Sequence, residues 1–184
     1  MKNVNLENVS EAQEFEKVVP GGYVCGITAV EDFPDKEYLL ISFDIAEGKL
    51  KNYYYELNKA KNFWGGTFIK SYKEKALPFF KGFITAVEKS NAGYKFNYDE
   101  STLKRKLFGA VIGEEEYEAN DGSIKVRTKV VEIHSVDKIR KGDFKVPALK
   151  KLSGSQSQTT QNVNQSYGDL SDFEEILSDG DVPF

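Results

Sequence analysis

The stretch RKLFGAVIGEEEYEANDGSIKVRTKVVEIH, residues 105–134, predicts a β-hairpin. Two runs rich in β-branched and aromatic residues flank Asn120-Asp121-Gly122, and an Asp-Gly pair between alternating runs is a strong signal for a tight turn. We therefore expect one strand at about residues 105–117 and a second at about 123–134.

Upstream of this hairpin, the sequence predicts three strands and one helix. Apolar residues alternate with others in residues 23–30 and 39–45, and residues 50–57 form a third alternating run. Residues 58–75 have no clean period, so we expect an irregular connection there. Residues 77–90 carry apolar side chains near helical spacing, which predicts a helix.

The predicted order of elements is three strands, a helix and a two-stranded hairpin. This order is typical of an OB-fold, a five-stranded barrel with a helix between strands 3 and 4. We therefore predict a mainly β protein with an OB-fold. Another small β-barrel and an α+β sheet remain as alternatives.

Composition divides the chain into four parts. Residues 1–17 are expected to form a flexible lead-in, and residues 18–150 a single folded domain that binds nucleic acid. Residues 151–169 are expected to be a disordered Gln/Ser-rich linker, because its centre has no apolar side chain to bury. Residues 170–184 form an acidic tail that we expect to bind partner proteins.

Several classes of protein are disfavoured by what the sequence lacks. There is no run of about 18 apolar residues and no secretory signal, so neither a membrane span nor export is expected. Cys25 is the only cysteine, which rules out an internal disulfide and favours a cytoplasmic protein. His134 is the only histidine, and we expect no metal and no cofactor.

The net charge of -4 averages over two unlike parts of the chain. Residues 152–184 contain six acids and no basic residue, whereas residues 1–151 contain all 25 lysines and arginines. Within the latter, residues 49–108 hold 13 basic and five acidic residues, together with 14 aromatic residues. A basic body with an acidic tail is typical of proteins that bind polyanions.

Three cations alternate along the second strand of the hairpin. Ile124, Val126 and Val130 are expected on the core face of this strand, and Lys125, Arg127 and Lys129 on the opposite face. The cations would lie about 7 Å apart, close to the spacing of successive phosphates. An ordinary solvated face is the alternative.

Aromatic and basic residues also mix in residues 49–66. In a strand, Lys51, Tyr53 and Tyr55 would share one face, and the two rings would offer stacking platforms for bases. Trp64 lies beside Phe63 in a predicted loop and would suit a clamp on single-stranded DNA. The alternatives are that the tyrosines fill a half-buried strand and that Trp64 closes the end of the barrel.

The sequence favours a binding protein over an enzyme. His134 has no obvious nucleophile as a partner, and no phosphate-binding or dinucleotide-binding glycine motif occurs. The acids at 114–118 could mimic a metal site, but only alternate residues of a strand share a face. A metal-dependent nuclease stays open as an alternative.

The last residues of the chain carry the most specific motif. Asp179 and Asp181 precede Val182-Pro183-Phe184, and a Gln/Ser-rich linker lies upstream. This end resembles the C-terminal tip of bacterial and phage single-stranded DNA-binding proteins, particularly those of phages of Gram-positive bacteria. The resemblance implies a protein of the bacterial host cytoplasm that recruits replication, recombination or repair proteins through these five residues.

We therefore expect a non-enzymatic, sequence-tolerant protein that coats single-stranded DNA and recruits partners through its tip. The expected DNA-binding residues are Lys49, Lys51, Tyr53, Tyr55, Lys59, Lys61, Phe63, Trp64, Lys70, Arg105, Lys125, Arg127 and Lys129. A replication adaptor that binds no DNA is a further alternative. Homo-oligomers through strand edges also remain open.

Overall fold

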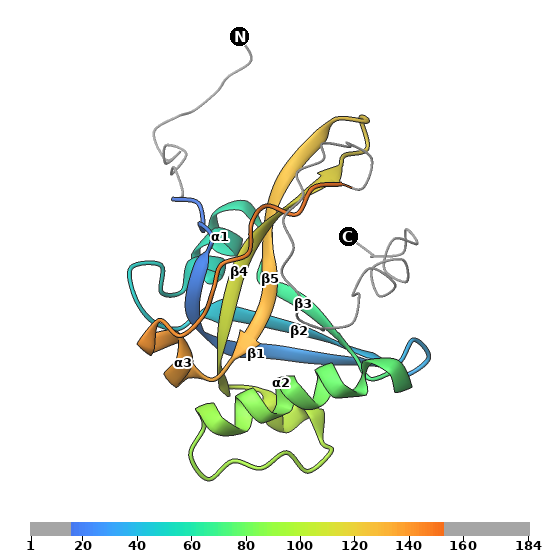
Figure 1. Ribbon diagram of the computed structural model, residues 1–184, viewed down its shortest axis with the longest axis vertical. Coiled ribbons are helices and arrows are strands. Elements are labelled where there is room, and N and C mark those ends of the chain that lie inside the picture. The colour runs from blue at the N-terminus through green and yellow to red at the C-terminus, as the bar shows by residue number, and fades with distance from the viewer. Residues whose placement is uncertain (1–15, 153–184) are drawn as a thin grey trace, which may run out of the picture. The chain divides into compact units, whose positions relative to one another are not determined.

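Five strands form in residues 16–152, the part of the chain that the computed structural model describes (Figure 1). Their bounds are Gly21–Phe33 for β1, Tyr38–Ile45 for β2, Thr67–Ser71 for β3, Leu107–Glu118 for β4 and Ile124–His134 for β5. The strands form one open sheet in the order β3-β2-β1-β4-β5, and each neighbouring pair is antiparallel. The prediction of a mainly β fold is confirmed.

The predicted hairpin is the pair β4 and β5. Glu118 lies opposite Ile124, and the Ala119 N–H donates to the Ser123 carbonyl at 2.8 Å across the turn. Gly122 has a φ of 76°, a left-handed conformation that costs glycine little. The Asp-Gly signal therefore located this turn correctly.

Strand β2 supplies one side of the core. Leu39, Ile41, Phe43 and Ile45 are all buried, as their alternation in the sequence predicts. They pack with buried residues of β1, of β4 and of the helices in one hydrophobic cluster.

The helices occupy the connections between strands. The α-helices are α1 at Tyr53–Lys61, α2 at Leu77–Ser90 and α3 at Val136–Lys141, and the short 3-10 helices are η1 at Glu74–Ala76 and η2 at Glu100–Leu103. The prediction of a helix over 77–90, between the third and fourth strands, is confirmed. The short α3 was not predicted. Within residues 16–152, no helix is long and apolar enough to cross a membrane.

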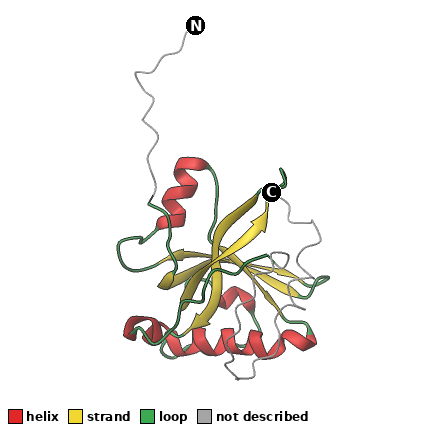
Figure 2. Cartoon of the chain, turned by 45° about the horizontal axis from the view of Figure 1, so that its top comes forward, coloured by secondary structure: helices red, strands yellow, loops and turns green. Residues whose placement is uncertain are grey.

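Helices α1 and α2 lie at opposite ends of the strands (Figures 1 and 2). Phe83 and Val87 of α2 are buried, and so is Tyr54 of α1. All three belong to the same core cluster. The two helices therefore close the core from two sides.

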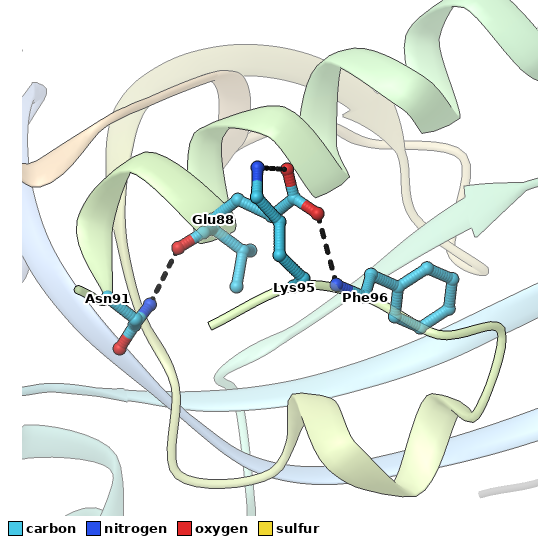
Figure 3. Close-up of polar contacts among 5 residues, drawn as sticks. Glu88, Asn91, Lys95 and Phe96 are labelled. Carbon is cyan, nitrogen blue, oxygen red and sulfur yellow. Dashed lines mark hydrogen bonds and ion pairs between the residues drawn. The ribbon is translucent and has the colours of Figure 1, made fainter. Parts of the chain in front are cut away.

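The end of α2 is fastened to β4 by Asn91. Its side-chain amide donates to the carbonyls of Val87 at 2.7 Å and Leu107 at 2.8 Å, and its oxygen accepts from the Leu107 N–H at 3.0 Å. Figure 3 shows the chain beyond Asn91 folded back on the helix, where Glu88 accepts from Lys95 and from the Phe96 N–H. These bonds position the start of β4 against α2.

The prediction of a third strand at 50–57 is wrong. Residues 53–61 form α1, and the third strand is β3, inside the stretch 58–75 that was expected to be irregular. Three tyrosines in a row favour a strand locally, but tertiary contacts override such propensities. The contact that does so here is made by Asp44, described below.

The predicted core face of β5 is confirmed for Val130, which packs against the core, but is wrong for Ile124 and Val126. They are 58% and 52% exposed. Strand β1 pairs with β4 only from Leu107 to Ile112, so the outer part of the hairpin projects past the start of β1. Residues 124–128 of β5 are therefore exposed on both faces of the strand.

Candidate nucleic-acid interface

Asp44, at the end of β2, organises the segment with the aromatic and basic residues. Its carboxylate is buried and accepts three backbone hydrogen bonds, from Ile45 at 2.8 Å and from Tyr54 and Tyr55 at 2.9 Å each. The last two donors lie in the first turn of α1, where backbone N–H groups have no partner within the helix. Asp44 therefore caps α1 from a distant position in the sequence.

The cap fixes where the helix begins. Asn52 adopts a left-handed conformation with φ of 62° and makes no side-chain cap bond itself. Its N–H donates to the Ile45 carbonyl at 2.8 Å, which holds the turn against the end of β2. The negative charge of Asp44 also faces the positive end of the helix dipole.

Helical geometry sends the three tyrosines in different directions. Tyr54 is buried, and its ring meets Phe43 edge-on at a centroid distance of 5.3 Å. Burial raises the pKa of the Tyr54 phenol. Tyr53 is half-buried against the core, whereas Tyr55 is 55% exposed. The prediction that Tyr53 and Tyr55 share one strand face is wrong, because residues two apart on a helix diverge.

Exposed aromatic and basic side chains gather on α1 and the segment after it. Tyr55 and Lys59 are both exposed and lie four residues apart, on one face of the helix. Phe63 is 57% exposed just beyond the last turn. We call the exposed residues Lys51, Tyr55, Lys59, Lys61 and Phe63 the α1 surface. One acidic residue, Glu56, lies among them in the sequence.

Trp64 lies differently from Phe63. It is half-buried against the core, and its indole N–H donates to the Gly66 carbonyl at 3.1 Å. Its ring centroid is 6.5 Å from that of Tyr54. This position fits the alternative, in which Trp64 packs into the fold rather than forming a clamp on DNA, and it leaves Phe63 as the exposed ring of the pair.

Gly66 allows this close approach of the chain. A Cβ atom there would lie 2.3 Å from the Phe43 carbonyl oxygen and 2.7 Å from the Tyr54 ring. The Phe43 N–H donates to the Gly66 carbonyl at 2.8 Å. A side chain at 66 would therefore separate β3 from α1 and shift Trp64.

The cations of the hairpin are paired with acids. Glu115 is buried, and Arg127 lies 2.6 Å from its Oε1, while Lys129 pairs with its other oxygen. Lys125 lies 3.4 Å from Asp121. Arg127 also sits over the Tyr117 ring, 5.1 Å from its centroid. The sequence correctly placed the three cations on one face but did not reveal their counterions.

Three other predicted DNA contacts are not part of the α1 surface. Lys49 is in the turn before α1 and pairs with Glu16 at 2.6 Å. Arg105 is exposed in the turn before β4, where its N–H donates to the Ile27 carbonyl. Lys70 is half-buried on β3, with its ammonium 5.9 Å from the Phe68 ring centroid.

The acids at 114–118 do not converge. Glu115 faces Arg127 and Lys129, and Glu116 accepts a hydrogen bond from the Leu152 N–H at 3.2 Å. His134 lies 2.9 Å from Glu132. Within residues 16–152, no group of three or more His, Cys, Asp or Glu side chains is placed to hold a metal ion.

The predicted partner-binding residues lie outside the described part of the chain. These are Asp179, Asp181, Val182, Pro183 and Phe184. The linker prediction for residues 153–169 and most of the lead-in prediction fall outside it as well.

Comparison with known proteins gives no relative. No known family model matches the chain, and no curated protein matches it.

Replacing Asp44 tests whether its carboxylate holds α1 in place. We expect Asp44→Ala to lower the free energy of unfolding by about 3 kcal/mol, because it leaves backbone donors near the core without an acceptor. Asp44→Asn, which keeps one acceptor oxygen, is expected to lose about half as much. Urea unfolding followed by circular dichroism measures both. Asp35→Ala, in the exposed turn after β1, is the control, and an equal effect of Asp35→Ala and Asp44→Ala would contradict the role of Asp44.

Proposed function

We propose that the chain binds single-stranded DNA without sequence preference, chiefly through the α1 surface. The observation that carries this proposal is that Tyr55 and Phe63 are more than half exposed in the same short stretch of chain as the exposed Lys51, Lys59 and Lys61. Exposed rings are costly in water unless they have a partner, and bases provide flat apolar faces. The lysines supply attraction to the phosphates between those bases.

Stacking on these two rings accounts for binding that tolerates any sequence. Each base stacked on an aromatic side chain contributes about 1–3 kcal/mol, and every base has a face to offer. Lysine contacts to phosphates add affinity that falls as salt rises, because bound counterions are released. No hydrogen-bond pattern specific to one base is required.

We also propose that the sheet is an OB-fold. In the order β3-β2-β1-β4-β5, the strands β3 and β5 are the two edges that closure into a barrel would bring together. The helix α2 lies between β3 and β4 in the chain and packs on the core, as the helix of an OB-fold does. OB-folds are common carriers of single-strand binding, which supports the proposal by analogy only.

The hairpin has a smaller role in this proposal than its sequence predicts. Glu115 neutralises part of the charge of Arg127 and Lys129, and a phosphate would have to compete with that buried carboxylate. Among the described residues, Lys59 makes no ion pair comparable to those of Arg127 and Lys129. We therefore assign first contact with DNA to α1.

The second part of the proposal is that the acidic tail, residues 170–184, binds partner proteins. The Phe184 ring would enter an apolar pocket of a partner, and Pro183 lowers the entropy cost of ordering the segment. The similarity of this tip to those of single-stranded DNA-binding proteins supports a role in recruiting replication, recombination or repair proteins.

Substitutions on the α1 surface test the proposed interface. We expect Tyr55→Ala and Phe63→Ala each to weaken binding to a dT oligomer by about 1–3 kcal/mol, because each removes a stacking platform. Lys59→Ala should reduce the slope of log affinity against log salt by about 0.7. Fluorescence anisotropy of a labelled oligomer, with duplex DNA as competitor, measures these changes.

The matched control is Tyr98→Ala, since Tyr98 is 93% exposed and follows the loop after α2. It should leave affinity within about twofold. Equal losses for Tyr98→Ala and Tyr55→Ala, or wild-type binding to dT no tighter than to duplex DNA, would contradict the proposal.

Deleting residues 179–184 tests whether the folded domain binds DNA while the acidic tail recruits partner proteins. We expect the affinity for dT to be unchanged or higher, because the segment carries negative charge and no stacking surface of the body. Capture of host replication and repair proteins by the immobilised protein should be lost. A deletion that abolishes DNA binding would show that the tail is part of the DNA site.

A further inference from the structure

The outer part of the hairpin, residues 113–129, carries a sheet face that continues the core-facing side of β4 and β5. Ile112 and Val130 lie opposite each other on that side, and both pack into the core. Beyond them the hairpin extends past the start of β1 as an arm (Figure 1). Residues opposite each other in an antiparallel pair share one face. We call this side of the arm the arm face, and it consists of Glu114 with Thr128, Glu116 with Val126 and Glu118 with Ile124.

Two apolar side chains are open to solvent on the arm face. Ile124 and Val126 are both more than half exposed, and both lie on β5, an edge strand of the sheet. Exposed apolar side chains that alternate along an edge strand are a common site of contact between proteins. These two residues supply the hydrophobic part of an interface.

The neighbouring strand gives the arm face a negative charge. Glu114, Glu116 and Glu118 alternate along β4 on this side, and β5 places no basic residue there. Glu116 accepts a hydrogen bond from the Leu152 N–H. Among the described residues, neither Glu114 nor Glu118 has a partner for a side-chain hydrogen bond or an ion pair. A face of this charge repels phosphate groups, so it suits a basic protein surface and not DNA.

The α1 surface has the chemistry that the arm face requires. It combines lysines, which outnumber the one nearby acid, with the exposed rings of Tyr55 and Phe63. The lengths also match. The nine residues of α1 extend about 13 Å, and Glu114 to Glu118 extend about 14 Å along β4. Apolar groups would then meet apolar groups, and carboxylates would meet ammonium groups, along the whole contact.

Pairing through the open edge of β5 is a poorer way to join two copies of the chain. Lys125, Arg127 and Lys129 alternate on the other side of that strand. Antiparallel pairing of two β5 edges would place cations of one copy opposite cations of the other, and like charges opposite each other destabilise a sheet. Contact through the acidic arm face avoids this repulsion.

We propose that the arm face of one copy docks on the α1 surface of a second copy, and that single-stranded DNA displaces it. Each copy carries both surfaces, so two copies that exchange arms form a closed dimer with two identical contacts. The displacement rests on the proposed function, because DNA and the arm would occupy the same lysines and rings. The docking itself does not depend on DNA binding, and it covers the exposed rings when no DNA is bound.

Charge reversal on the two surfaces tests the docking. The mass of the full chain is measured by analytical ultracentrifugation over a concentration series at low salt. For the wild type, we expect the average mass to rise with concentration and to fall when salt is added. Glu118→Lys and Lys59→Glu each bring like charges together, so each should weaken self-association about tenfold. An equimolar mixture of these two variants brings opposite charges together again and should recover it.

The control is Asp35→Lys, which makes the same change of charge in the exposed turn after β1. It should leave self-association unchanged, and circular dichroism shows that each variant is folded. Three results would each overturn the inference. They are a wild type that stays monomeric at every concentration, equal self-association of the wild type and Glu118→Lys, and a mixture of the two variants that does not recover.

Titration with a short dT oligomer separates this inference from the proposed function. Saturating dT should convert the assembled wild type to single chains with bound DNA. Glu118→Lys should bind dT more tightly than Asp35→Lys at concentrations where the wild type is assembled, and equally well at high dilution. If the wild type assembles but binds no dT, the proposed function fails and the docking stands. If it assembles and dT binds without changing its mass, the displacement is wrong.

Discussion

The buried carboxylate of Asp44 is the contact on which the proposed interface depends. By accepting the N–H groups of Tyr54 and Tyr55, it turns a sequence with strand propensity into the first turn of a helix. The helix then places Tyr54 in the core and Tyr55 on the surface. Asp44 itself is held in place because β2 is fixed by β1 and β3. The sheet thus determines which aromatic residues are left for a ligand.

The basic side chains differ in whether they are paired with acids, and the sequence alone does not show this difference. On the hairpin, Arg127 and Lys129 pair with the buried Glu115, and Lys125 pairs with Asp121. These ion pairs help to stabilise the part of the hairpin that projects beyond β1. Lys70, by contrast, has no acid partner among the described residues and sits on an apolar strand.

The sequence predicted the elements whose signals are local. The Asp-Gly turn, the alternation of β2 and the apolar spacing of α2 each depend on residues close together in the chain, and all three predictions were correct. The helix α1 was missed because its cap comes from a residue ten positions upstream. The short β3 was missed because its pairing with β2 gives no local period. Of the predicted site, the exposure of Tyr55 and Phe63, the half-burial of Trp64 and the counterions of the hairpin required the three-dimensional structure.

Photocrosslinking tests the central claim, that single-stranded DNA lies on the α1 surface, most directly. The full chain would be irradiated with an oligomer in which iodouracil replaces thymine, and the adducts mapped by peptide mass spectrometry. Adducts are expected to concentrate in the segment from Tyr53 to Phe63, at Tyr55 and Phe63. Adducts confined to the hairpin strands β4 and β5, or an absence of adducts under conditions where the oligomer binds, would contradict it.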